Sequence, residues 1–299
     1  MSAQRLTSHA YALQEALRSL LGPAYGAFYW AVSLDKKGYS GVVLIARGPR
    51  LSVVGGAAGA EAGPAPAAGA KQKTLGAFFA KAPGAAAPAA DAPAAPAAAG
   101  AWGAAGAPQR VSFGLGAAGA HAQEGRTVTL EFASFALVIA YVPNAGEGLK
   151  RVDFRVDSWE VDMRAYLLAL AAGGKPVVYG GDLNVAHADG DIWNPTAKHI
   201  AKSAGTSPGE RAAFGQMLTE CGLVDTFRAV HPDAQHCYSY WSQRAGNRPF
   251  NRGLRLDYFV ASQGLAGASS GLRLHDAFIC SGGTDGVSDH APVGVVLAL

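Results

Sequence analysis

The sequence has little charge and no long apolar run. Asp, Glu, Lys and Arg make up 16% of its 299 residues. A net charge of +3 is too small by itself to indicate a nucleic-acid-binding protein. Residues 135–142 are among the longest apolar stretches, and they fall far short of the roughly 18 residues that a membrane-spanning helix needs. We therefore expect no membrane partner.

Cysteine is scarce as well. The chain has three, Cys221, Cys237 and Cys280, which are widely spaced and form no CxxC pair. This pattern favours reduced thiols in an intracellular protein over a disulfide scaffold or a zinc site. Arg5 and Glu15 interrupt the apolar core that a secretory signal would need near the start.

Large side chains are rare in one long segment. All but twelve of the 55 residues from 55 to 109 are Ala, Gly or Pro. Such a segment has almost nothing to bury, so it cannot offset the entropy that it would lose on ordering. It predicts a disordered insertion that divides one domain into residues 1–54 and 110–299.

Within this insertion, Gln72, Leu75, Phe78 and Phe79 match the Qxx(L/I/M)xx(F/Y)(F/Y) pattern of peptides that bind the sliding clamp of DNA replication. A single 3₁₀ turn has three residues per turn, so it would stack Leu75 and Phe78 on one side with Phe79 adjacent. The resulting apolar plug, flanked by lysines, suits a pocket on an acidic partner. The alternative is a hydrophobic cluster that docks on its own domain.

The rest of the chain alternates expected strands with expected helices. Apolar runs bounded by turn residues predict strands at 28–32, 41–46, 110–116, 127–132 and 136–142. Apolar periodicity and capping residues predict helices at 8–21, 158–172 and 208–220. Helices alternating with antiparallel hairpins suggest two packed mixed sheets flanked by helices.

A polar pair follows a short apolar strand at residues 175–179. Asp182 and Asn184 lie two apart, so an extended backbone turns their side chains to one face. A carboxylate that accepts a proton, beside an amide that donates to an oxyanion, suits hydrolysis of an anionic ester. The alternative is ordinary turn chemistry, for which Asp and Asn are common choices.

A second pair lies late in the chain. Asp257 ends the strand expected after the loop 244–255, and His290 directly precedes the last expected strand, 293–299. An Asp-His dipeptide alone carries little information. Here Asp257 is available to orient His290 and raise its basicity, an arrangement that hydrolases need.

The blocks around these residues resemble a known family. Residues 181–187 read Gly-Asp-Leu-Asn-Val-Ala-His and are followed by Asn194-Pro195, which is similar to the signature of the exonuclease III / Ape-type abasic-site endonucleases. The family's other blocks are matched in order by residues 38–42, 124–126, 140–146, 255–259 and 288–292. The resemblance covers residues 24–54 and 110–299.

This resemblance implies a four-layer α/β sandwich that cuts duplex DNA on the 5′ side of an abasic site in base excision repair, with 3′–5′ exonuclease activity as an addition. It implies Mg²⁺, with Mn²⁺ as the alternative, and oxygen ligands favour both over zinc. The implied catalytic residues are Tyr141, Asn144, Asp182, Asn184, Asp257 and His290. The implied metal ligands are Asp182, Asn184, Asp289 and His290. The implied DNA contacts are Arg151, Lys198, Tyr240, Arg244, Arg248, Leu254 and Leu256, with Lys150, Arg155, Arg252 and Arg255 as further basic residues.

The chain departs from the family in two ways. Its opening lacks the block with a metal-side Asn and the Gln-Glu-Thr-Lys block whose Glu binds the metal, so we expect an N-terminally truncated domain. Leu254 stands where the family usually has Trp. One alternative is therefore a catalytically impaired, clamp-tethered DNA-binding relative. Another is a related phosphoesterase that acts on RNA or phosphoinositide.

The clamp peptide and the implied repair role together predict a monomer in the nucleus, with a plastid or mitochondrion as the alternative location.

Overall fold

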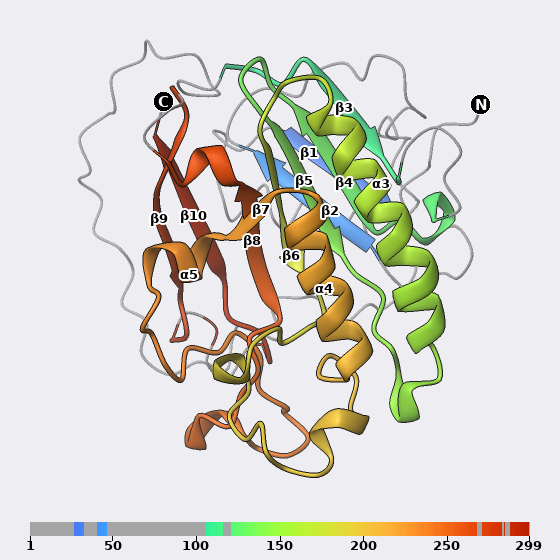
Figure 1. Cartoon of the computed structure of the whole chain (residues 1–299), viewed down its shortest axis with the longest axis vertical. Coiled ribbons are helices and arrows are strands. Elements are labelled where there is room, and N and C mark those ends of the chain that lie inside the picture. Colours follow the sequence, from blue (N-terminus) through green and yellow to red (C-terminus); the bar gives the residue numbers. More distant parts are fainter. Residues whose placement is uncertain are drawn as a thin grey trace, which may run out of the picture.

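The computed structural model describes residues 27–32, 41–46, 106–115, 121–267, 271–282, 284 and 288–298 (Figure 1). Its strands are β1 (Ala27–Val32), β2 (Gly41–Ala46), β3 (Arg110–Phe113), β4 (Thr127–Glu131), β5 (Ala136–Tyr141), β6 (Val177–Asp182), β7 (Leu223–Asp225), β8 (Asp257–Ser262), β9 (Arg273–Ile279) and β10 (Val293–Ala298). Its helices are α3 (Glu160–Ala171), α4 (Pro208–Glu220) and α5 (Thr226–Val230).

Six strands form the central sheet, in the order β3-β4-β5-β6-β8-β7. Within it β5 and β6 run parallel and the other neighbours run antiparallel. Parallel neighbours need a crossover, and α3 supplies it between β5 and β6. The chain then returns antiparallel along β8, so the end of β6 and the start of β8 meet at one edge.

Side chains alternate across the sheet as a two-residue period requires. On β5, Ala136, Val138 and Ala140 face α3 and α4 and pack with Trp159 and Phe214. The intervening Leu137 and Ile139 face the opposite side, where they join a separate apolar cluster. The sheet is therefore covered on both faces, which fits the buried central strands.

The second face is covered by two antiparallel strand pairs, β1-β2 and β9-β10. β2 contacts β4 and β5, and β10 contacts β8, so the pairs form a layer behind the central sheet (Figure 1). The helices α3 and α4 lie on the other side. This layering agrees with the predicted sandwich of sheets and helices. The expected helix at 8–21 and the clamp peptide 72–79 lie outside the described residues.

The helix predicted at 158–172 differs at its start. A π-helical segment, Phe154–Trp159, precedes α3, and no side chain caps α3, because the chain is already helical there. The helix predicted at 208–220 is confirmed: Ser207 and Glu210 form a reciprocal capping box at the start of α4. Across the described ranges we find no helix with the length and apolarity to span a membrane.

Candidate active site

The predicted catalytic residues meet where three neighbouring strands approach the same edge. In the register of the sheet, Tyr141 of β5 pairs with Asp182 of β6, and Asp182 pairs with Asp257 of β8. His290 lies before β10 and is tied to this edge by a backbone bridge to Tyr240. The strand ends therefore bring together residues from distant parts of the sequence.

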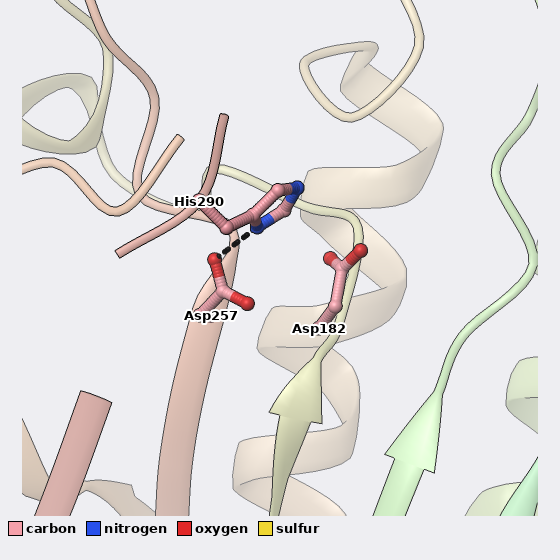
Figure 2. Close-up of side chains that lie close together, drawn as sticks. All are labelled: Asp182, Asp257 and His290. Carbon is pink, nitrogen blue, oxygen red and sulfur yellow. Dashed lines mark hydrogen bonds and ion pairs between the residues drawn. The ribbon is translucent and has the colours of Figure 1, made fainter. Parts of the chain in front are cut away.

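Asp257 and His290 form a hydrogen-bonded pair, with 2.7 Å between Asp257 Oδ2 and His290 Nδ1. Figure 2 shows the imidazole projecting from this bond toward Asp182. Burial lowers the pKa of His290, but the hydrogen bond and charge of Asp257 outweigh it, so the pKa is raised overall. Because Nδ1 is engaged, Nε2 is the ring nitrogen that remains for a substrate.

The environment of Asp182 favours its neutral form, whereas that of His290 favours its charged form. Burial, and then the negative charge of Asp257, raise its pKa to about 7, against the lowering effects of His290 and of the Asn184 N–H. A carboxyl group with a pKa near neutrality can both accept and release a proton at physiological pH. Asp182 is therefore suited to general acid–base chemistry or to binding a cation.

Asn184 connects Asp182 to the neighbouring loop. Its backbone is left-handed, with φ of 49°, a conformation that Asn tolerates better than most residues. Its amide nitrogen donates to Val142 O at 2.8 Å and lies 3.3 Å from Asp182 Oδ2. Its amide oxygen accepts from Asn144 Nδ2 at 2.9 Å. Asn144 and Asn184 thus form a chain of amides that orients Asp182.

The site offers a fitting donor set for a divalent cation. One ligand atom each from Asp182, Asp257 and His290 lies within 4.8 Å of the others. Two carboxylates and one imidazole suit Mg²⁺ or Mn²⁺, which prefer oxygen ligands. A cation would also relieve the repulsion that raises the pKa of Asp182. The predicted ligand Asp289 is not part of this group, in which Asp257 takes part instead.

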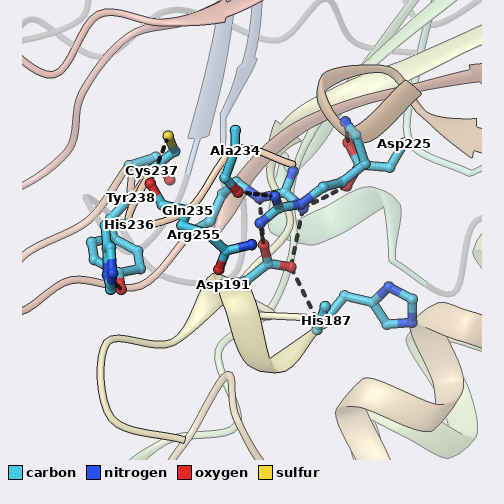
Figure 3. A network of polar contacts seen from close by, with 12 residues as sticks. His187, Asp191, Asp225, Ala234, Gln235, His236, Cys237, Tyr238 and Arg255 are labelled. Carbon is cyan, nitrogen blue, oxygen red and sulfur yellow. Dashed lines mark hydrogen bonds and ion pairs between the residues drawn. The ribbon is translucent and has the colours of Figure 1, made fainter. Parts of the chain in front are cut away.

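A salt-bridge network behind the site was not predicted (Figure 3). The guanidinium of Arg255 binds both oxygens of Asp191 at 2.9 and 3.0 Å and reaches Asp225 at 2.5 Å. Arg228 binds Asp191 at 2.6 Å, and Asp191 also accepts the N–H of Ala188. The network fixes the segment after β6 to the segment before β8 and to α5. Arg255 begins the motif block 255–259 and Asp191 follows the block 181–187, but neither block indicates that the two side chains pair.

Two of the expected basic DNA contacts are instead interior residues. Arg255 is 1% exposed, and Arg155 is fully buried, so neither can reach a phosphate. Arg155 pairs with Glu160 and donates from Nη2 to Leu183 O at 2.8 Å, directly beside Asp182. These two predictions were wrong because position in a basic stretch does not reveal which guanidinium turns inward.

The other basic residues predicted to contact DNA differ in how exposed their side chains are. Lys198 and Arg244 are exposed, whereas Arg151 is half-buried, with its guanidinium 4.9 Å from the Phe154 ring centroid. Arg248 stacks on Trp241 and donates to Ser288 O at 2.7 Å. Arg248 therefore anchors the loop that leads to His290.

The predicted pocket wall lies beside the catalytic pair. The ring of Tyr240 is 5.0 Å from that of His290, and Tyr240 and Leu254 line a cavity of about 130 Å³. Leu256 is 5% exposed and packs beneath these residues. Tyr240 and Leu254 can meet a ligand in this cavity, while Leu256 supports them from below.

An acid–imidazole cluster at the strand ends of an α/β sandwich is the arrangement of a hydrolytic enzyme. The model of the Endonuclease/Exonuclease/phosphatase family matches residues 4–290. The chain belongs to this family.

Several known proteins are similar to this chain in sequence or in structure. The chain is 43% identical over 193 residues to a DNA-(apurinic or apyrimidinic site) endonuclease of Dictyostelium discoideum, covering 64% of this chain but 50% of that protein. It is 44% identical over 190 residues to an exodeoxyribonuclease of Bacillus subtilis, covering 64% and 70%. Among solved structures, AP endonuclease LMAP from Leishmania major has a TM-score of 0.55 and 34% identity, covering 62% of this chain and 60% of that one. The chain thus spans about half the length of the Dictyostelium relative.

Proposed function

We propose that the protein hydrolyses the phosphodiester bond on the 5′ side of an abasic site in duplex DNA, with the help of Mg²⁺. The observation that carries this proposal is the His290–Asp257 pair facing Asp182 at the strand ends. The relatives named for abasic-site endonuclease and exodeoxyribonuclease activity support the choice of DNA as substrate. The second name also favours removal of nucleotides from the end of a DNA strand as an additional activity.

Each residue has a defined task in this mechanism. Asp182, oriented by Asn184, accepts the proton of the attacking water. His290, held by Asp257, whose charge favours the protonated ring, donates from Nε2 to an oxygen of the phosphate as negative charge develops. Tyr141 and Asn144 border the same edge and position the phosphate. The carboxylates of Asp182 and Asp257 would hold a divalent cation, which would supply positive charge to offset that of the phosphate.

The cavity beside His290 supplies a basis for selecting an abasic site. It is small, and the Tyr240 ring and the Leu254 side chain form part of its wall. A deoxyribose without a base can enter such a space more easily than a complete nucleotide. The exposed Lys198 and Arg244 provide positive charge for the DNA backbone, where contacts position the duplex without reading its sequence.

The test is incision of a duplex with one abasic site by the full chain, with Mg²⁺ and with a chelator, beside Asp182→Ala. The proposal requires incision that is lost in the variant and with the chelator. Binding of the duplex without incision would instead support the catalytically impaired relative. Cleavage of RNA or phosphoinositide in preference to the abasic duplex would support a different phosphoesterase.

We further propose that Gln72, Leu75, Phe78 and Phe79 bind a sliding clamp, and that the protein acts in the nucleus as a monomer. The residue pattern supports the first point, and the nuclear location follows from it. Capture of the chain by immobilised clamp should be lost in the Phe78→Ala/Phe79→Ala double variant. Equal capture of both chains would contradict this proposal.

A further inference from the structure

Two exposed aromatic side chains lie next to the proposed active site. Trp193 is 37% exposed and Phe250 is 69% exposed, although large apolar groups on a surface are unfavourable unless they are used. The guanidinium carbon of Arg252 lies 5.3 Å from the Trp193 ring centroid and 5.2 Å from that of Phe250. We call Trp193, Arg252 and Phe250 the aromatic platform.

The platform is continuous with the catalytic pair. Trp193 and Arg252 line the same cavity as Tyr240, whose ring contacts His290. The backbone N–H of Trp193 also donates to Gly253 O at 3.1 Å, so the two loops that carry the platform are joined. A nucleic acid strand that has a phosphate at His290 and enters this cavity would therefore meet Trp193 and Arg252, with Phe250 beside Arg252.

We propose that the aromatic platform binds an unpaired base of single-stranded DNA by stacking. This inference rests on the proposed function, because it takes the strand at His290 to be DNA. In an intact duplex both faces of a base are covered by its neighbours, so an exposed ring can stack only on a base that has left the helix. Every base has a flat π-face, so such a contact tolerates any sequence.

The charge of the platform fits the same occupant. Arg252 is exposed and carries a positive charge between the two rings, where it can contact the phosphate of the stacked nucleotide. A purely apolar protein partner would have to bury this guanidinium without a counter-charge. The combination of two rings and one cation matches a nucleotide, which presents a flat base and an anionic phosphate together.

The inference predicts a role in handling frayed or single-stranded ends. A strand whose terminal base has lost its partner could place that base on Phe250 or Trp193 while its phosphate lies at His290. The platform would then favour unpaired over paired termini without contributing to the chemical step. Its residues are consequently positioning residues for one class of substrate.

The experiment measures binding of the full chain to two fluorescein-labelled 12-mers by anisotropy in a chelator. One 12-mer consists of thymidines, and the other consists of three-carbon propanediol spacers, which have the same phosphate charge but neither a base nor a sugar ring for the cavity. The parent should bind the thymidine strand more tightly. Phe250→Ala should reduce this preference at least about fivefold, since one stacked base contributes roughly 1–3 kcal/mol. Phe250→Tyr should keep it.

Control variants separate stacking from a general surface effect. Leu168→Ala removes a similarly exposed side chain, 44% exposed on α3, and should leave the preference unchanged. Equal preference in the parent and Phe250→Ala, or no preference in the parent, would overturn the inference. Incision of the abasic duplex is scored separately. Its absence, with the thymidine preference intact, would count against the proposed function alone.

Discussion

Asp182 and Asp191 are two buried or half-buried carboxylates in one continuous segment, yet their environments shift their pKa values in opposite directions. Burial and the charge of Asp257 raise the pKa of Asp182 to about 7. Burial also raises the pKa of Asp191, but the charge and hydrogen bonds of Arg255, with those of Arg228 and Ala188, lower it overall. The first group is left reactive and the second is fixed in its charged form.

The difference lies in the donors that surround each carboxylate. Asp191 accepts from two guanidinium groups and one backbone N–H, so its charge is fully compensated. Within the part of the chain that the structure describes, Asp182 accepts hydrogen bonds from Asn184 alone, and it faces a second carboxylate, Asp257. Asp191 therefore stabilises the fold next to the proposed active site, while Asp182 remains available to bind a substrate or a cation.

The largest expected effect is on catalysis. Asp182→Asn keeps the shape of the side chain but removes its ability to accept a proton. Incision of an abasic duplex should fall by about 10²- to 10⁴-fold, the range for loss of a general base. Because the folded-state pKa of Asp182 is raised, its ionisation lowers stability progressively as pH rises from its unfolded pKa, near 3.9, to about 7, and the loss is complete above that pH. The metal-free variant should therefore unfold at a higher urea concentration than the parent at pH 8, and a lower one would contradict this view.

Asp191→Asn should instead lower the stability of the fold. It leaves the buried guanidinium of Arg255 without its bidentate partner, which costs about 3–5 kcal/mol in the free energy of unfolding. Urea unfolding measures this loss. The matched control is Asp189→Asn, which breaks an exposed pair with Arg211 and should cost less than about 1 kcal/mol. Equal costs for the two variants would show that Asp191 is not a structural carboxylate.

Asp257→Asn tests whether the two reactive groups depend on each other. The change removes the charge that raises the pKa of both His290 and Asp182, so both values should fall. Incision should decrease by about 10² at pH 7, within the range for loss of an acid–base partner. NMR titration of the His290 imidazole provides the direct readout. An unchanged His290 pKa would mean that the hydrogen bond does not set its protonation.

The smallest expected effect is the pH dependence of the stability that Asp191 contributes. The pKa of Asp191 is lowered on folding, so its contribution to stability is complete above its unfolded pKa, near 3.9, and is lost as pH falls through the folded value. The gap in unfolding free energy between the parent and Asp191→Asn should stay constant from pH 5 to 7 and narrow below about pH 4. A gap that does not change at low pH would argue against the assigned role.

The catalytic cluster was predictable because it lies at strand ends. Apolar runs located β5 and β6, and short motifs placed Asp182 and Asp257 beside strand ends. Asp257 was predicted to end its strand, but it begins β8. The partner of Asp191 could not be predicted, since the path of the loops decides which guanidinium meets which carboxylate. Arg155 was predicted to lie on the surface and contact DNA for a similar reason, although its side chain is buried. It lies in the π-helical segment before α3, where no local pattern indicated which side chains turn inward.

The strand register that joins Tyr141, Asp182 and Asp257 also determines when the proposed site is completed during synthesis of the chain. These residues and His290 come from segments far apart in the sequence, and contacts between distant segments form late in folding. Before His290 has left the ribosome and β10 has joined β9, the chain has no complete nucleophile-activating cluster. The proposed activity should therefore report completed folding of the chain.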